Sequence, residues 1–187
     1  MTTAVVADDA PLIREAIAAV LESAGIKVVG LVGAADALLA AVATTRPDVA
    51  VVDVRMPPTY RMEGLQAAVQ MRRLHPRLGI LLLSQHVEPQ YLRQLLAGGA
   101  GSTGYLLKER AAGIAAFVEA VKTIARGGCA FDPQVVSALV TSTRAADAVA
   151  ALSPREQQVL ELMAEGWSNA AIADRLQIIE LLSELVG

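Results

Sequence analysis

Short runs of β-branched and leucine residues alternate with helical patterns along the first two thirds of the chain. The apolar runs are candidate strands, and they occupy residues 3–7, 27–32, 49–54, 79–84 and 104–107. Between these runs apolar residues recur at helical spacing, for example at Leu12, Ala16 and Val20. Strands buried on both faces read as continuous apolar runs, and their alternation with helices favours a parallel sheet covered on both sides. The pattern therefore predicts an α/β domain with a doubly wound, five-stranded parallel sheet.

The last third of the chain is predicted to hold a smaller helical unit. A helical pattern near residues 111–126 ends at two glycines, which favour a helix C-cap and close the first domain. We therefore expect a first domain over residues 1–127, a linker over 128–150 and a small all-α segment over 151–187. One short helix is expected in the linker, after Pro133.

Composition excludes several classes of protein. The single cysteine, Cys129, excludes an internal disulfide and a multi-cysteine zinc site. The segment "MTTAVVADDA" carries two aspartates where a signal peptide needs cations followed by an apolar run. The longest purely apolar stretches fall far short of the roughly 18 residues that span a bilayer. We expect a cytoplasmic protein that does not enter the membrane.

Chemistry-bearing residues gather at the ends of the predicted strands. Ligands of a doubly wound sheet bind outside the carboxyl ends of its strands. Asp8 and Asp9 follow the first strand, Asp53 ends the third, Ser84 ends the fourth and Lys108 follows the fifth. Three clustered carboxylates repel one another unless a cation intervenes, and hard oxygen ligands suit Mg²⁺. The sequence therefore predicts a magnesium site at this edge.

Such a site can accept a phosphoryl group. One carboxylate can act as the nucleophile, while Mg²⁺ and Lys108 neutralise the transferred oxygens and Ser84 donates a hydrogen bond to the same group. Each residue also has a structural explanation when taken alone; Asp8 and Asp9, for example, can cap the helix that begins at Pro11. Their joint placement at the ends of the predicted strands favours a functional site.

The motifs around these residues resemble a known family. The segments "VVADDAPLIREAI", "VVDVRMPP", "LLLSQH" and "GYLLKE" are similar to the receiver domain of two-component response regulators. The resemblance spans residues 3 to about 126 and implies the CheY-like fold, with strand order 2-1-3-4-5. It implies a sensor histidine kinase as the phosphoryl donor, and no enzymatic activity beyond self-dephosphorylation. The implied site comprises the phosphoacceptor Asp53, Mg²⁺ bound by Asp8, Asp9, Asp53 and the backbone carbonyl of Arg55, the cation Lys108, and the switch residues Ser84 and Tyr105.

The segment "LSPREQQVLELMAEGWSNAAIADRL" (152–176) resembles the LuxR-type helix-turn-helix of NarL/FixJ regulators. The resemblance implies transcription regulation through DNA binding. The continuation "QIIELLSELVG" lacks the basic recognition helix of that family. Residues 151–187 carry two arginines against six carboxylates, so the charge balance predicts that this segment binds DNA poorly.

Alternatives follow from the same residues. The first is a phosphorylation-controlled interaction protein without DNA binding. We expect an apolar stripe along residues 170–186 to pack against another copy of the chain, the linker or the receiver, with a homodimer as the commonest outcome. The second is a phosphatase that turns over on Asp53. One common hydrolase pattern places a second aspartate two residues after the nucleophile, where this chain has Arg55. His75 and His86 have no companion at metal-ligand spacing, although His86 follows Ser84 closely enough to influence the site.

Overall fold

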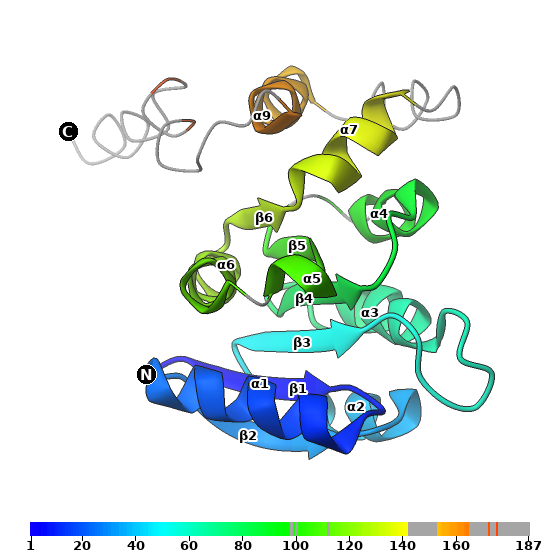
Figure 1. Cartoon of the computed structure of the whole chain (residues 1–187), viewed down its shortest axis with the longest axis vertical. Coiled ribbons are helices and arrows are strands. Elements are labelled where there is room, and N and C mark those ends of the chain that lie inside the picture. Colours follow the sequence, from blue (N-terminus) through cyan, green and yellow to red (C-terminus); the bar gives the residue numbers. More distant parts are fainter. Residues whose placement is uncertain are drawn as a thin grey trace.

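A computed structural model of the chain describes residues 1–97, 99, 101–111, 113–141, 153–164, 172 and 175. Within this part of the chain, one parallel sheet forms the centre of the molecule, with strand order β2-β1-β3-β4-β5-β6 (Figure 1). The strands are β1 (Thr3–Ala7), β2 (Lys27–Val32), β3 (Val49–Asp53), β4 (Gly79–Ser84), β5 (Thr103–Leu107) and β6 (Cys129–Phe131). The predicted doubly wound α/β fold is confirmed.

Helices cover both faces of the sheet. The helices of the described chain are α1 (Pro11–Ser23), α2 (Ala35–Thr45), α3 (Glu63–Leu74), α4 (Pro89–Leu96), α5 (Lys108–Ala111), α6 (Ile114–Ala125), α7 (Pro133–Thr141) and α9 (Pro154–Ala164). α1 and α6 pack on one face, where Leu21 and Val121 belong to the same buried cluster. α2, α3 and α4 pack on the other face, where Leu38, Leu65 and Leu92 belong to a second cluster.

The alternation of side chains along each strand explains the two clusters. In β1, Ala4 and Val6 point into the cluster under α1 and α6, whereas Val5 and Ala7 point into the cluster on the opposite face. All five residues of β3 are buried, as expected for a strand covered on both sides. The continuous apolar runs seen in the sequence are therefore the consequence of two covered faces.

The predicted count of five strands is wrong by one. β6 pairs in parallel with β5, and the Asp132 backbone N–H extends the contact by donating to the Tyr105 carbonyl at 2.8 Å. This strand has only three residues, too few to show a hydrophobic period, and it lies where the linker was expected. The helix expected after Pro133 is found as α7.

The helices at the carboxyl end of the described chain agree with the expected elements. The helix expected near residues 111–126 is α6, preceded by the short α5. α7 packs against α4 on one side and α9 on the other, and its buried Val135 and Leu139 join the core cluster that also contains Leu160 of α9. The apolar stripe over 170–186 lies outside the described residues, apart from Ile172 and Arg175. Among the described helices, none is long and apolar enough to cross a membrane.

Candidate metal centre

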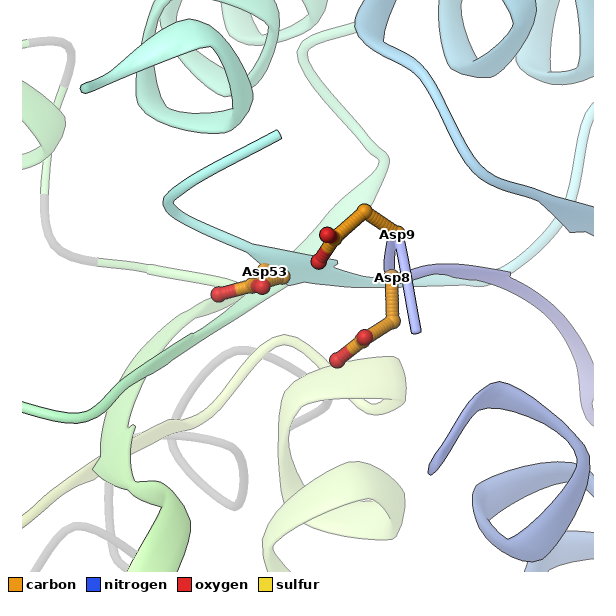
Figure 2. A group of neighbouring side chains, drawn as sticks. All are labelled: Asp8, Asp9 and Asp53. Atoms are coloured by element: carbon orange, nitrogen blue, oxygen red, sulfur yellow. The ribbon is translucent and has the colours of Figure 1, made fainter. Parts of the chain in front are cut away.

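Three carboxylates converge at the carboxyl edge of the sheet. Asp8 and Asp9 come directly after β1, and Asp53 is the last residue of the neighbouring strand β3. Figure 2 shows the three side chains gathered at this edge, and one ligand oxygen from each lies within 4.8 Å of the others. Carboxylate oxygens are the ligands that hard divalent cations prefer. The predicted convergence is confirmed, and this donor set fits a divalent cation.

Lys108 links two of these carboxylates. Its Nζ donates to Asp8 Oδ2 at 2.8 Å and to Asp53 Oδ2 at 2.9 Å. The lysine begins α5 immediately after β5, so the end of that strand carries its ammonium group to the acidic residues of β1 and β3. Burial alone would lower the pKa of Lys108, but the bonds to Asp8 and Asp53 outweigh burial and raise it. Lys108 therefore remains charged beside the phosphoacceptor candidate.

Asp53 lies in a less polar environment than its charge would favour. Asp53 is only 6% exposed to solvent. Burial raises the pKa of Asp53, and the hydrogen bond from Lys108 offsets only part of that effect. The Arg55 backbone N–H reaches Asp53 Oδ1 at 3.4 Å. A buried carboxylate with one cation beside it and two more carboxylates nearby is favourably placed to gain a second cation.

Ser84 and Tyr105 meet at one backbone carbonyl. The Ser84 hydroxyl and the Tyr105 phenol each donate to the carbonyl of His86 at 3.0 Å. The His86 N–H in turn donates to Ser84 Oγ at 3.2 Å. Tyr105 is fully buried, and burial raises the pKa of its hydroxyl. Ser84 thus bonds the loop after β4 here, and its predicted hydrogen bond to a phosphoryl group remains a prediction.

Arg55 and His86 border the site from two loops. The Arg55 guanidinium lies 4.0 Å from the Glu88 carboxylate, which precedes α4, so this pair joins the loops that follow β3 and β4. Both Arg55 and His86 are exposed. His75 caps the carboxyl end of α3 and lines a cavity with Asp48, at the opposite edge of the sheet. Binding of Mg²⁺ by the Arg55 backbone carbonyl remains a prediction.

Two further residues shape the site, and neither is marked by a clear pattern in the sequence. Arg14 Nη1 in α1 donates to the Asp8 carbonyl at 2.6 Å and so holds the loop that bears the first two aspartates. Gly64, in the first turn of α3, approaches so closely that a Cβ there would lie 1.8 Å from the Asp53 carbonyl oxygen. A glycine near a helix start is a weak signal in sequence, because its meaning depends on the neighbouring strand.

Comparison with known proteins agrees with this geometry. Residues 4–121 match the response regulator receiver domain, and residues 150–180 match the luxR family of bacterial regulatory proteins. The chain belongs to the response regulator family. This response regulator combines a receiver domain with a LuxR-type helix-turn-helix segment, as the resemblances in the sequence had implied.

Similar proteins and structures match two thirds of the chain or more. The response regulator is 37% identical to the probable transcriptional regulatory protein NarL of Mycobacterium tuberculosis, over 93% of this chain and 79% of that protein. The structure of the receiver domain of the putative response regulator NarL from the same organism superposes with a TM-score of 0.59 at 36% identity, covering 67% of this chain and 97% of that domain. The structure of RcsB from Salmonella enterica serovar Typhimurium, bound to promoter rprA, superposes with a TM-score of 0.58 at 27% identity. The match covers 95% of this chain and 84% of that chain.

Proposed function

We propose that Asp53 accepts a phosphoryl group from a sensor histidine kinase and that this transfer controls the LuxR-type segment. The observation that carries the proposal is the approach of Lys108 to Asp53 within a cluster of three carboxylates. An Asp53 oxygen attacks phosphorus, the bond from phosphorus to the donor's leaving atom breaks, and the leaving group departs with that electron pair. Lys108 neutralises charge on the transferred oxygens.

The proposed cation is Mg²⁺, held by Asp8, Asp9 and Asp53 together with the backbone carbonyl of Arg55. When bound, Mg²⁺ would neutralise the carboxylates and the incoming phosphoryl oxygens. Asp8 is 1% exposed, so its charge is poorly hydrated and gains from a second cation beside Lys108. The hydrogen bond from Arg14 keeps the Asp8 backbone in place for that role.

Ser84 and Tyr105 are the proposed switch. Both hydroxyls donate to the His86 carbonyl, so that carbonyl keeps one partner if Ser84 turns toward a phosphoryl group on Asp53. The rotation would move one hydrogen bond from the loop after β4 to the phosphorylated residue. That loop leads into α4, which packs against α7. The change at Asp53 thereby reaches the helices that precede the LuxR-type segment.

The proposed output is regulation of transcription from the cytoplasm, where a kinase with access to ATP can phosphorylate the receiver. RcsB is a relative seen on a promoter, which supports DNA as the target. Residues 151–187 have two arginines against six carboxylates, so we propose that this chain alone holds nonspecific duplex weakly. A gel-shift titration at low salt tests this point, and tight binding that weakens steeply with salt would contradict it.

Intact-mass spectrometry with acetyl phosphate tests the phosphoacceptor. The parent chain should gain one phosphoryl adduct with Mg²⁺ and none with a chelator present. Asp53→Asn should abolish the adduct, whereas Asp36→Asn, a change at an exposed aspartate of α2, should leave it intact. An adduct that persists in Asp53→Asn would refute the assignment.

The same experiment separates a receiver from a phosphatase. We propose that the protein is not an enzyme, so that acetate release should follow adduct formation with little turnover. The arginine at position 55 supports this reading, because a turnover phosphatase of the common aspartate type has a second carboxylate there. Rapid, continuous acetate release that depends on Asp53 would favour the phosphatase.

A further inference from the structure

Arg72 is a buried arginine of α3 that the phosphoacceptor chemistry does not use. Its residue is 8% exposed, whereas the next residue in the helix, Arg73, is exposed. A guanidinium taken out of water needs partners for its fixed fork of donors, and burial lowers the pKa of this one. The contacts that compensate for burial therefore indicate what Arg72 does.

The guanidinium bonds three backbone carbonyls of the loop that joins α4 to β5. Nη2 of Arg72 donates to the Gly99 carbonyl at 2.8 Å and also to the Gly101 carbonyl, and Nη1 reaches the Ser102 carbonyl at 3.4 Å. Gly99 and Ser102 have positive φ angles of 100° and 56°. Carbonyls in such a turn cannot all pair within the turn itself, and the arginine fork supplies donors from outside it.

The opposite side of this loop faces α9. A cavity of about 180 Å³ separates the receiver from that helix, and Gly101 forms part of its wall. Leu96 and Phe131 line the receiver side, and Val159 and Leu160 line the α9 side. Leu96, Phe131 and Leu160 also belong to one buried cluster. The loop that Arg72 holds therefore forms part of the cavity wall that faces α9, while α9 itself packs against α7.

The loop has further backbone tethers. The Ile80 N–H of β4 donates to the Ser102 carbonyl at 2.8 Å, and the Gly99 N–H donates to the Leu96 carbonyl at 2.8 Å. The Ser102 N–H donates to the Gly127 carbonyl at 3.0 Å, and Gly127 lines the same cavity. The Gly101 carbonyl also accepts from Thr103 Oγ1 at 3.1 Å. Loss of Arg72 would remove the bonds to the Gly99 and Gly101 carbonyls and leave this part of the loop held by fewer contacts. Arg72 thus helps to set the position of Gly101 in the cavity wall that faces α9.

We propose that Arg72 is a positioning residue that shapes the docking surface for α9 on the receiver. Its side chain fixes the α4–β5 loop from the α3 side, and the fixed loop in turn holds the first helix of the LuxR-type segment. Loss of Arg72 would release α9 while the sheet stays folded. The inference concerns the unphosphorylated chain, so it stands or falls independently of phosphorylation at Asp53.

Hydrogen exchange measured by mass spectrometry on the full chain tests the proposal. Arg72→Met keeps a long apolar stem but removes every donor. Exchange should become about tenfold faster in the loop around 99–102 and in α9 over 154–164, while β3 over 49–53 is unchanged. Arg73→Met is the matched control, since it removes an exposed arginine from the same helix, and it should exchange like the parent chain.

Arg72→Lys extends the test, because a single ammonium keeps the charge but cannot bridge three carbonyls. Its α9 exchange should lie between that of the parent and that of Arg72→Met. Unchanged α9 exchange in either variant, with β3 still protected, would overturn the proposal. If Arg72→Met also loses protection in β3, Arg72→Lys decides: faster exchange confined to the loop and α9 supports the inference, and any other pattern overturns it.

Discussion

Lys108 Nζ lies 2.9 Å from Asp53 Oδ2. The lysine follows β5 and the aspartate ends β3, so the contact joins the carboxyl ends of two strands of the sheet. Lys108→Met should lower the free energy of unfolding by about 2 kcal/mol without Mg²⁺, because Asp8 and Asp53 then lose a charge-assisted partner in a largely buried site. Urea denaturation measures the change, and added Mg²⁺ should restore part of it.

Lys122→Met provides the comparison for that prediction. Lys122 pairs with Glu119 at 3.7 Å on the surface of α6, with the glutamate side chain 69% exposed. Exposed pairs contribute little, so the loss should stay within about 0.5 kcal/mol. Equal losses in the two variants would show that Lys108 has no special role in holding the carboxylates.

Gly64 touches the backbone of Asp53 from the start of α3. Gly64→Ala should lower the free energy of unfolding by about 3 kcal/mol, the upper end for overpacking, because the new Cβ would overlap the Asp53 carbonyl oxygen. The rate of phosphorylation by acetyl phosphate should fall as well, since the strand end must move. Gly101→Ala, whose Cβ would lie 3.5 Å from the nearest atom, serves as the control and should be milder in both measurements.

Burial of Asp53 gives stability a defined dependence on pH. Because burial raises the pKa of Asp53 in the folded protein above its ordinary value, the charged carboxylate opposes folding at neutral pH without Mg²⁺. This penalty disappears as pH falls through the folded pKa toward the unfolded value. Asp53→Asn should therefore be more stable than the parent near pH 7, and the difference should shrink on acidification. Denaturation curves at several pH values measure this difference. A difference that stays constant with pH would contradict the assignment.

We expect Arg55 and His86 to flank the path by which water reaches a phosphoryl group on Asp53. Replacing both with alanine should change the rate of dephosphorylation several-fold, because attack requires the water to be in line. Mg²⁺ affinity should stay nearly the same, since neither side chain is a proposed ligand. Decay of the adduct, followed by mass spectrometry after the donor is removed, measures the rate. Identical decay in variant and parent would exclude a gating role for these side chains.

The apolar stripe over 170–186 predicts self-association of the full chain. Most of these residues lie outside the described part of the structure, so the expectation comes from the sequence. Several exposed Leu and Ile side chains would each forfeit about 1.5–3 kcal/mol of burial, which favours pairing of two copies. Light scattering should show a dimer for the full chain and a monomer for a chain ending at Arg175. Monomers in both samples would remove the prediction.

The sequence determined the fold class and the edge on which the site lies. Strands covered on both faces must be apolar throughout, so the five longer strands were visible, and three aspartates, a serine and a lysine at their ends could be assigned to one edge. Spacing along the chain carries this information because each strand of a parallel sheet delivers its carboxyl end to the same side.

Only the tertiary structure decided which atoms meet. β6 was missed because three residues show no period, and Ser84 bonds the His86 carbonyl because the loop after β4 folds back on the strand. The contacts of Arg14 with Asp8 and of Arg72 with the α4–β5 loop join segments that no local pattern relates. Such contacts depend on how the helices pack on the sheet, and packing follows from the whole chain and not from any one stretch of it.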